Sequence, residues 1–137
     1  MDAYEIIEQH WPYDGPHSAE TVINAADTLV GLVRYMNNAT RSPGRLNASQ
    51  LWRVLVELAS VAAGMDQLLR QLAATAQRVA TEVANQPGWY DDRHDRQAIE
   101  TALHVWSELN LATVALSRFD SRLRDAAAEA SHLGYQP

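Results

Sequence analysis

The chain has 137 residues, of which 47% are hydrophobic, and its formal net charge is −6 at pH 7. This length suits one domain, the hydrophobic content excludes a disordered chain, and the acidic balance argues against general binding to nucleic acid. The sequence contains no cysteine, which excludes disulfides, thiolate metal sites and a cysteine nucleophile.

The N-terminal residues carry neither a basic flank nor a long apolar run, so they do not resemble a secretory signal. No segment approaches the roughly 20 apolar residues that span a bilayer. We therefore expect a cytoplasmic protein without a membrane partner. Breaks at residues 12–16, 42–44 and 87–88 separate segments with helical apolar spacing, and no strand pattern is present.

The first predicted helix covers residues 18–39 and follows an N-terminal arm, residues 1–16. Ser18 is a favourable N-cap, and the "SPG" turn ends the helix. The face expected to pack is an apolar stripe of Val22, Ala26, Leu29, Val33 and Met36. The arm contains "DAYEIIEQHW", which can form a short helix of its own.

The second predicted helix covers residues 47–85 and carries a heptad stripe. Asn47 can cap it, with Gln50 at the matching position of a capping box. Gly64 costs too little to break so long a helix, about 1 kcal/mol relative to alanine. The stripe consists of Leu51, Leu55, Leu58, Ala62, Met65, Leu69, Leu72, Ala76, Val79 and Val83.

The third predicted helix covers residues 91–133. Either Asp91 or Asp92 is its expected N-cap, Asp95 lies in its first turn, and Asp92 can pair with Arg96. Its heptad stripe consists of Ala98, Ala102, Val105, Leu109, Ala112, Leu116, Phe119, Leu123, Ala126, Ala130 and Leu133.

Two acidic groupings on this helix invite a metal interpretation. Asp91, His94 and Asp95 could in principle bind a metal, but the helix start already explains the aspartates. Glu100, His104 and Glu108 recur every four residues, yet His104 faces away from the heptad stripe. We therefore expect neither a metal site nor a cofactor.

These elements predict an all-α, up-down-up helical bundle over residues 1–137, in which the second and third helices form a long antiparallel hairpin. At 1.5 Å per residue these two helices reach roughly 57 and 63 Å, whereas the first reaches roughly 33 Å. Part of the hairpin near Pro87 therefore needs other cover, which we expect from the N-terminal arm, from another chain (a second copy or a different protein partner), or from both. The interface candidates are Trp11, Val79, Val83, Trp89, Ile99, Leu103 and Trp106.

All eleven basic residues are arginine. Because alanine is also abundant, the chain resembles uncharacterised small all-α proteins of high-GC actinobacteria, a resemblance that implies no activity. Several arginines are expected at one end of the antiparallel bundle, where they could contact an anion: Arg34, Arg41, Arg45, Arg53, Arg118 and Arg122.

The sequence contains no phosphate-binding glycine loop, nucleophile elbow or zinc-protease motif, and we expect no catalytic residue. The favoured interpretation is a non-enzymatic protein–protein interaction or assembly module that self-associates, for example as a dimer, or binds an unidentified protein partner through its helix faces. One alternative is a regulatory or nucleic-acid-associated accessory protein that uses the arginine-rich end. Another is a bundle with an aromatic ligand pocket made by Trp11, Tyr13, Trp89 and Trp106.

Overall fold

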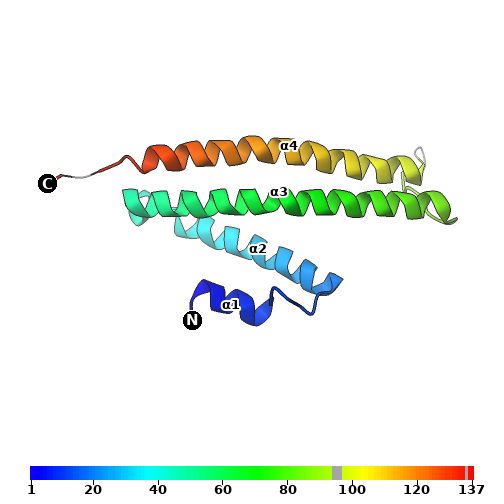
Figure 1. The fold of residues 1–137 in the computed structure, drawn as a ribbon, viewed down its shortest axis with the longest axis horizontal. Helices are drawn as coiled ribbons and strands as arrows, with labels where there is room; N and C mark the ends of the chain where they lie inside the picture. Colours follow the sequence, from blue (N-terminus) through cyan, green and yellow to red (C-terminus); the bar gives the residue numbers. More distant parts are fainter. Residues whose placement is uncertain (94–96, 135) are drawn as a thin grey trace. The chain divides into compact units, whose positions relative to one another are not determined.

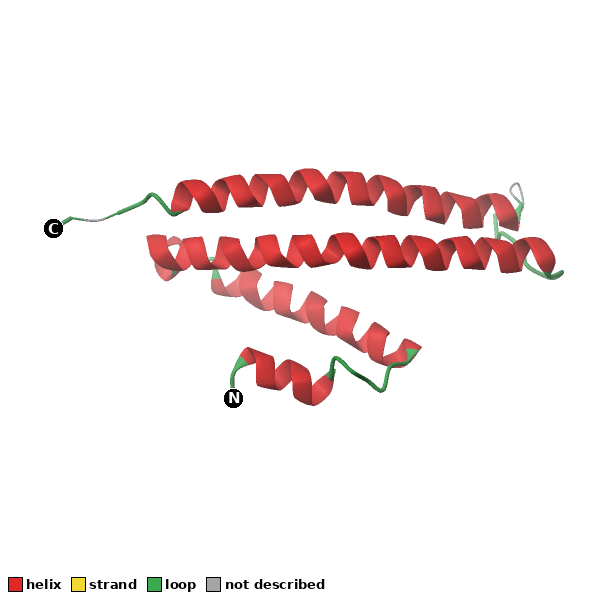
Figure 2. Ribbon diagram, in the orientation of Figure 1, coloured by secondary structure: helices red, strands yellow, loops and turns green. Residues whose placement is uncertain are grey.

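The computed structural model describes residues 1–93, 97–134 and 136–137. Every regular element in these ranges is helical, which confirms the all-α class (Figures 1 and 2). None of the described helices is long and apolar enough to cross a membrane. The elements are α1 (Ala3–His10), α2 (Ala19–Ala39), the short 3-10 helix η1 (Pro43–Arg45), α3 (Ala48–Asn85) and α4 (Ala98–Ala130).

The chain divides into two compact units, Met1–Leu46 and Asn47–Pro137. The sequence predicts one domain over residues 1–137. The first unit contains α1, α2 and η1, and the second contains α3 and α4.

Local hydrogen bonds explain where the helices of the first unit begin. Asp2 and Glu5 form a capping box at α1, which confirms that the arm contains a short helix. Ser18 caps α2 as predicted, with Thr21 as the reciprocal partner. Between the two helices, Gly15 has a positive φ of 98°, a conformation that glycine adopts without strain.

The second unit is the long antiparallel hairpin that the sequence predicts (Figure 1). The predicted capping box at α3 is present, because the Asn47 side chain accepts a hydrogen bond from Gln50 N at 2.9 Å and Gln50 Oε1 accepts one from Asn47 N at 3.0 Å. The helix then continues without interruption through Gly64 to Asn85. The two helices are packed against each other along the hairpin.

The predicted start of the last helix is wrong. The helix α4 begins at Ala98 rather than at residue 91, and its N-cap, Gln97, makes no side-chain capping bond. Asp91 is not a cap, because its carboxylate binds Arg93 and Thr101 instead. The predicted roles of His94, Asp95 and Arg96 lie outside the described residues. At the other end α4 stops at Ala130, whereas the sequence predicts residue 133.

Candidate interaction surface on the hairpin

The most completely buried apolar residues of α3 and α4 have small side chains. Every buried apolar residue in the described part of the chain is an alanine, and no large side chain there is fully buried. Helices that meet through alanine can approach closely, so this contact is narrow. The buried alanines are Ala59, Ala62, Ala73, Ala76 and Ala80 on α3, and Ala102 and Ala127 on α4.

These alanines define a seam with heptad spacing on both helices. The intervening seam positions are half-buried, apart from Trp106, which is 36% exposed. We call the whole set the seam. It comprises Leu55, Ala59, Ala62, Asp66, Leu69, Ala73, Ala76, Ala80 and Val83 on α3, and Ala102, Trp106, Leu109, Thr113, Leu116, Asp120, Leu123, Ala127 and Ala130 on α4.

Half of each predicted heptad stripe is displaced from this seam. Leu55, Ala62, Leu69, Ala76 and Val83 of the α3 stripe do lie in the seam, but the other half of the stripe lies one position before it. The same holds on α4, where residues 105, 112, 119 and 126 precede seam positions. The physical reason is size: alanines next to the leucines permit a closer approach of the helices than the leucines would.

Four of the displaced residues of α3 form a continuous apolar stripe together with Val54, Val61 and Leu68. Every member except Leu51 immediately precedes a seam position, so the stripe lies about 100° around the helix axis from the seam. Leu51, Val61, Leu68 and Leu72 are 40–44% exposed, and the remaining members are half-buried. The stripe consists of Leu51, Val54, Leu58, Val61, Met65, Leu68 and Leu72.

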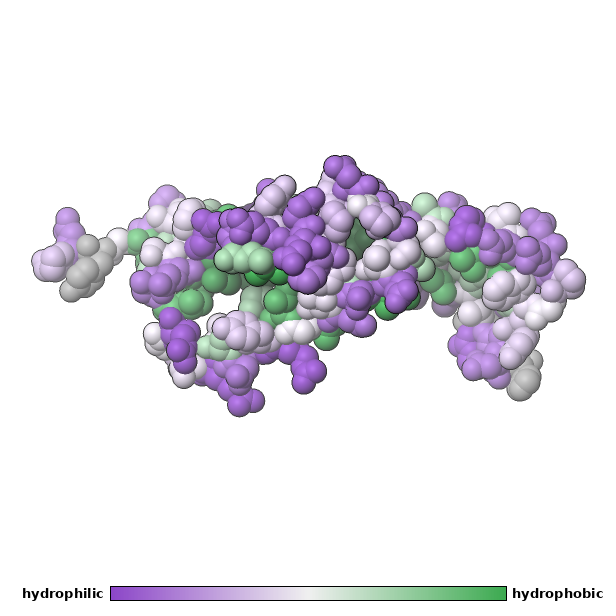
Figure 3. Space-filling view, turned by 90° about the horizontal axis from the view of Figure 1, so that it is seen from below, coloured by the Kyte–Doolittle hydropathy of each residue, from purple (hydrophilic) through white to green (hydrophobic). Residues whose placement is uncertain are grey.

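A matching stripe on α4 lies on the same side of the hairpin. In an antiparallel pair, the residues that precede the seam point to one common side, because both helices are right-handed and run in opposite directions. Phe119 in this stripe is 56% exposed. The apolar members of the α4 stripe are Val105, Ala112, Ala115, Phe119 and Ala126, and the other positions that precede the seam hold Thr101, Glu108, Arg122 and Glu129. The two stripes together are the apolar face. Apolar side chains at the molecular surface are visible as green regions in Figure 3.

The opposite side of the hairpin is mostly polar. The residues that follow seam positions include Ser60, Gln67, Arg70 and Gln77 on α3, and Asn110, Ser117, Ser121 and Arg124 on α4. The two sides therefore differ most clearly on α3. On α4 the difference is weaker, because Glu108, Arg122 and Glu129 lie on the side of the apolar face, and Leu103 and Val114 lie on the opposite side.

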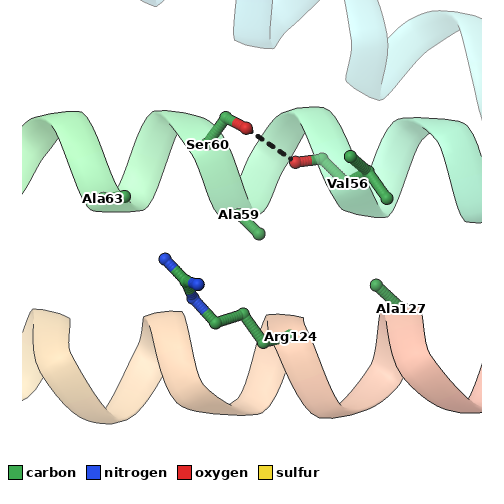
Figure 4. A pocket seen from close by; sticks show the side chains of 6 residues that line it. All are labelled: Val56, Ala59, Ser60, Ala63, Arg124 and Ala127. Atoms are coloured by element: carbon green, nitrogen blue, oxygen red, sulfur yellow. Dashed lines mark hydrogen bonds between the residues drawn. The ribbon is translucent and has the colours of Figure 1, made fainter.

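A shallow hollow of about 270 Å³ opens on the polar side, and Arg124 reaches into it from α4 (Figure 4). Arg124 is already neutralised, because its Nε donates to Asp120 Oδ1 at 2.9 Å, and this bond raises the pKa of Arg124. Arg70 binds the other seam aspartate, Asp66, in the same way at 2.9 Å. Both arginines therefore neutralise the charge of a seam carboxylate, and this pairing explains the positions of the arginines without a bound anion.

A polar clasp holds the tip of the hairpin. The Asp91 side chain is only 2% exposed and accepts hydrogen bonds from Arg93 N at 2.8 Å and Arg93 Nε at 3.0 Å. Arg93 Nη2 donates to the second carboxylate oxygen at 2.6 Å, and the Thr101 hydroxyl also donates to that oxygen. Asp91, Arg93 and Thr101, which we call the tip clasp, therefore attach the loop to the first turn of α4.

These bonds stabilise the ionised form of Asp91. The hydrogen bonds from the Arg93 side chain, then from Thr101 and from the Arg93 backbone, hold the pKa of Asp91 well below its usual range. Burial acts in the opposite direction but is the weaker influence. The carboxylate is thus charged, buried and fully partnered, which is a structural arrangement. No grouping of three or more metal-ligating side chains occurs among the described residues.

The predicted interface residues do not gather on one surface. Val83 and Trp106 lie in the seam, and Ile99 is half-buried near it. Val79 continues the apolar face towards the tip, whereas Leu103 lies on the opposite side and is 48% exposed. Two further candidates lie elsewhere: Trp89 is exposed in the tip loop, and Trp11 belongs to the first unit.

The predicted anion-contact residues divide between the units. Arg34, Arg41 and Arg45 belong to residues 1–46, and the other three belong to the hairpin. Arg53 is paired with Glu57 at 3.0 Å. Within the described ranges, no ion pair is found for Arg118 or Arg122.

The four predicted pocket aromatics are likewise divided. Trp89 and Trp106 of the hairpin make no ring contact with each other, and Trp11 contacts the His10 ring at a centroid distance of 5.7 Å. Trp11 instead contributes to an open groove of about 180 Å³ between α1 and α2. The sequence did not predict this groove. The groove is lined by Ile7, Trp11, Ala25, Thr28, Leu29 and Leu32.

No protein-family model, no curated protein and no solved structure matches this chain.

Proposed function

We propose that the protein is a helical assembly module whose hairpin binds a second copy through the apolar face. One observation carries this proposal: four large apolar residues on one side of α3 are 40–44% exposed, while the buried apolar residues of the described chain are all alanines. The four are Leu51, Val61, Leu68 and Leu72. Extended apolar patches on a soluble protein usually mark an interaction surface. The proposal involves neither catalysis nor a cofactor.

The size of the face supports a stable interface. The hairpin extends over the 33 residues of α4, which corresponds to a length of about 50 Å. Two helices packed side by side are about 20 Å wide, so this whole side of the hairpin, with its polar positions included, covers on the order of 1,000 Å². A stable protein–protein interface needs about 800 Å² per partner. Two hairpins that pair through this face would form a four-helix bundle, a common arrangement for amphipathic helices.

Matched charge substitutions on the two sides of the hairpin test the proposal. Leu68 lies on the apolar face and Leu103 on the opposite side, and their exposures are similar, 43% and 48%. We expect the wild-type protein to be dimeric in sedimentation velocity at micromolar concentration. Leu68→Glu should shift it to the monomer, because the new carboxylate would be buried without a partner. Leu103→Glu should leave the dimer intact.

Circular dichroism should show that both variants keep their helix content, which separates loss of assembly from loss of folding. A wild-type protein that stays monomeric at every concentration would contradict the proposal. The apolar face would then be covered by residues 1–46 or would bind a different protein. Equal dissociation by the two glutamates would show that the apolar face has no special role.

A further inference from the structure

We infer that a second copy is recognised at the apolar face by reciprocal ion pairs, in which Arg122 of each copy binds Glu108 of the other. This inference rests on the proposed function, because it names the residues that select a second copy at that face. The observation that carries it is the placement of opposite charges on this side of α4, at equal distances from the middle of the helix.

Three charged residues of α4 lie on the side of the apolar face. Glu108, Arg122 and Glu129 immediately precede seam positions, as the apolar members of the stripe do. All three are exposed, and no ion pair is found for any of them within the described ranges. A second copy on this face would cover their side chains, and a covered charge without a partner is costly. The two copies must therefore bring opposite charges together.

Two-fold symmetry, which most homodimers have, leaves two ways to place the copies. An axis parallel to the helices puts α4 of each copy over α3 of the other, with both tips at one end. An axis across the helices puts α4 over α4 and α3 over α3, with the tips at opposite ends. The charges of α4 distinguish the two arrangements, because they meet different neighbours in each.

The axis parallel to the helices leaves the charges of α4 without partners. The hollow places Arg124 of α4 beside Ala59 of α3 (Figure 4). Because the two helices are antiparallel, Arg122 is then level with Val61. In this arrangement Arg122 of each copy would cover Val61 of the other, in a stripe of leucine, valine and methionine that contains no carboxylate.

The axis across the helices pairs the charges. Ala115 lies midway between Glu108 and Arg122, and it is one residue from the middle of α4 (Ala98–Ala130). An axis that passes Ala115 therefore sets Arg122 of each copy opposite Glu108 of the other, while nearly the whole length of the helices stays in contact. Packed helices are about 8–10 Å apart, a distance that an arginine and a glutamate side chain span together.

The same axis also suits the rest of the face. In the register that the hollow sets, Ala115 is level with Leu68, so the apolar stripe of α3 meets its counterpart with Leu68 near the centre. Glu129 comes opposite Thr101, in the first turn of α4 of the second copy. The positive end of the helix dipole favours a carboxylate there.

An exchange of charge between the two positions tests the inference. Arg122→Glu and Glu108→Arg each place like charges opposite each other twice per dimer. Each variant alone should therefore dimerise at least about tenfold more weakly than the wild type in sedimentation velocity. The two variants mixed in equal amounts should form a heterodimer, because one then carries two carboxylates at these positions and the other carries two guanidinium groups. A chain with both substitutions should dimerise as the wild type does.

The matched control is Arg118→Glu, which changes the net charge as Arg122→Glu does. Arg118 is exposed and has no ion pair within the described ranges. It precedes the seam position of Asp120 by two residues, so it points away from the seam and lies outside the apolar face. This variant should keep the dimer intact. Circular dichroism of every variant checks that the helix content is unchanged.

The outcomes separate the inference from the proposed function. A wild-type monomer would overturn both. A wild-type dimer whose two charge variants stay monomeric when mixed would overturn the inference alone, as would single variants that dimerise as tightly as the wild type. Equal weakening by Arg118→Glu would also overturn it, because the net charge, and not the position of the charges, would then control assembly.

Discussion

Two stripes run side by side along α3, one residue apart in the sequence, and they differ in burial. The alanines at positions 59, 62, 73, 76 and 80 are buried, whereas Val61 and Leu72, which immediately precede two of them, are 44% and 40% exposed. Hydrophobicity alone would bury the leucines first. The difference indicates that the fit of the side chains, and not hydrophobicity alone, selects the contact between two helices.

The largest expected effect comes from enlarging a residue of the seam. Ala73 is 5% exposed, so Ala73→Leu must force α3 and α4 apart, and overpacking of this kind typically costs about 1–3 kcal/mol. The control is Ala74→Leu on the polar side, which is exposed and should change stability by less than about 0.5 kcal/mol. Urea unfolding followed by circular dichroism measures both. Equal losses would mean that the alanines do not define the contact.

This comparison also shows what the sequence could predict. The helix boundaries at Ser18 and Asn47 were predictable because short side chains there cap the backbone through local hydrogen bonds. The hairpin followed from the apolar heptads and the break at Pro87. The exact seam did not follow, because two overlapping heptads share half of their positions, and only the packing of a second helix decides between them.

The tip of the hairpin was the least predictable part of the structure, because its contacts also join residues that are not neighbours in the sequence. An aspartate before a helix usually caps it, and a local rule assigns Asp91 that role. Asp91 instead accepts hydrogen bonds from Thr101 and Arg93, and the contact with Thr101 joins residues ten apart.

The position of the seam, by contrast, had a signal in the sequence. The seven buried alanines have heptad spacing, and this spacing could have located the seam.

A smaller effect is expected from the tip clasp, where the buried group is polar. Thr101→Val removes a donor from the buried Asp91 carboxylate and should lower the midpoint of thermal unfolding at neutral pH. The matched control is Thr113→Val, which loses only a bond to the Leu109 carbonyl within α4, at 2.9 Å, and should change the midpoint little.

The contribution of the clasp should also depend on pH. The folded-state pKa of Asp91 is depressed, and an aspartate in an unfolded chain has a pKa of about 3.9. Unfolding therefore takes up a proton below about pH 4, so the stabilisation is complete above that pH and is lost as the pH falls. The difference between wild type and Thr101→Val should shrink from pH 7 to pH 3. A constant difference over this range would show that Thr101 does not act through the Asp91 charge.

The smallest effect is expected for the exposed ion pairs. Arg53 and Glu57 are four residues apart on α3, 3.0 Å from each other, and their side chains are 70% and 59% exposed. Such pairs contribute about 0.3–0.5 kcal/mol, and salt weakens them further. A double-mutant cycle with Arg53→Gln and Glu57→Gln should therefore give a coupling energy below about 0.5 kcal/mol that vanishes in 1 M salt. A coupling energy several times larger would mean that the charged surface of the hairpin contributes as much to its stability as the alanine seam. The comparison of the two stripes of α3 would then leave out an important stabilising interaction.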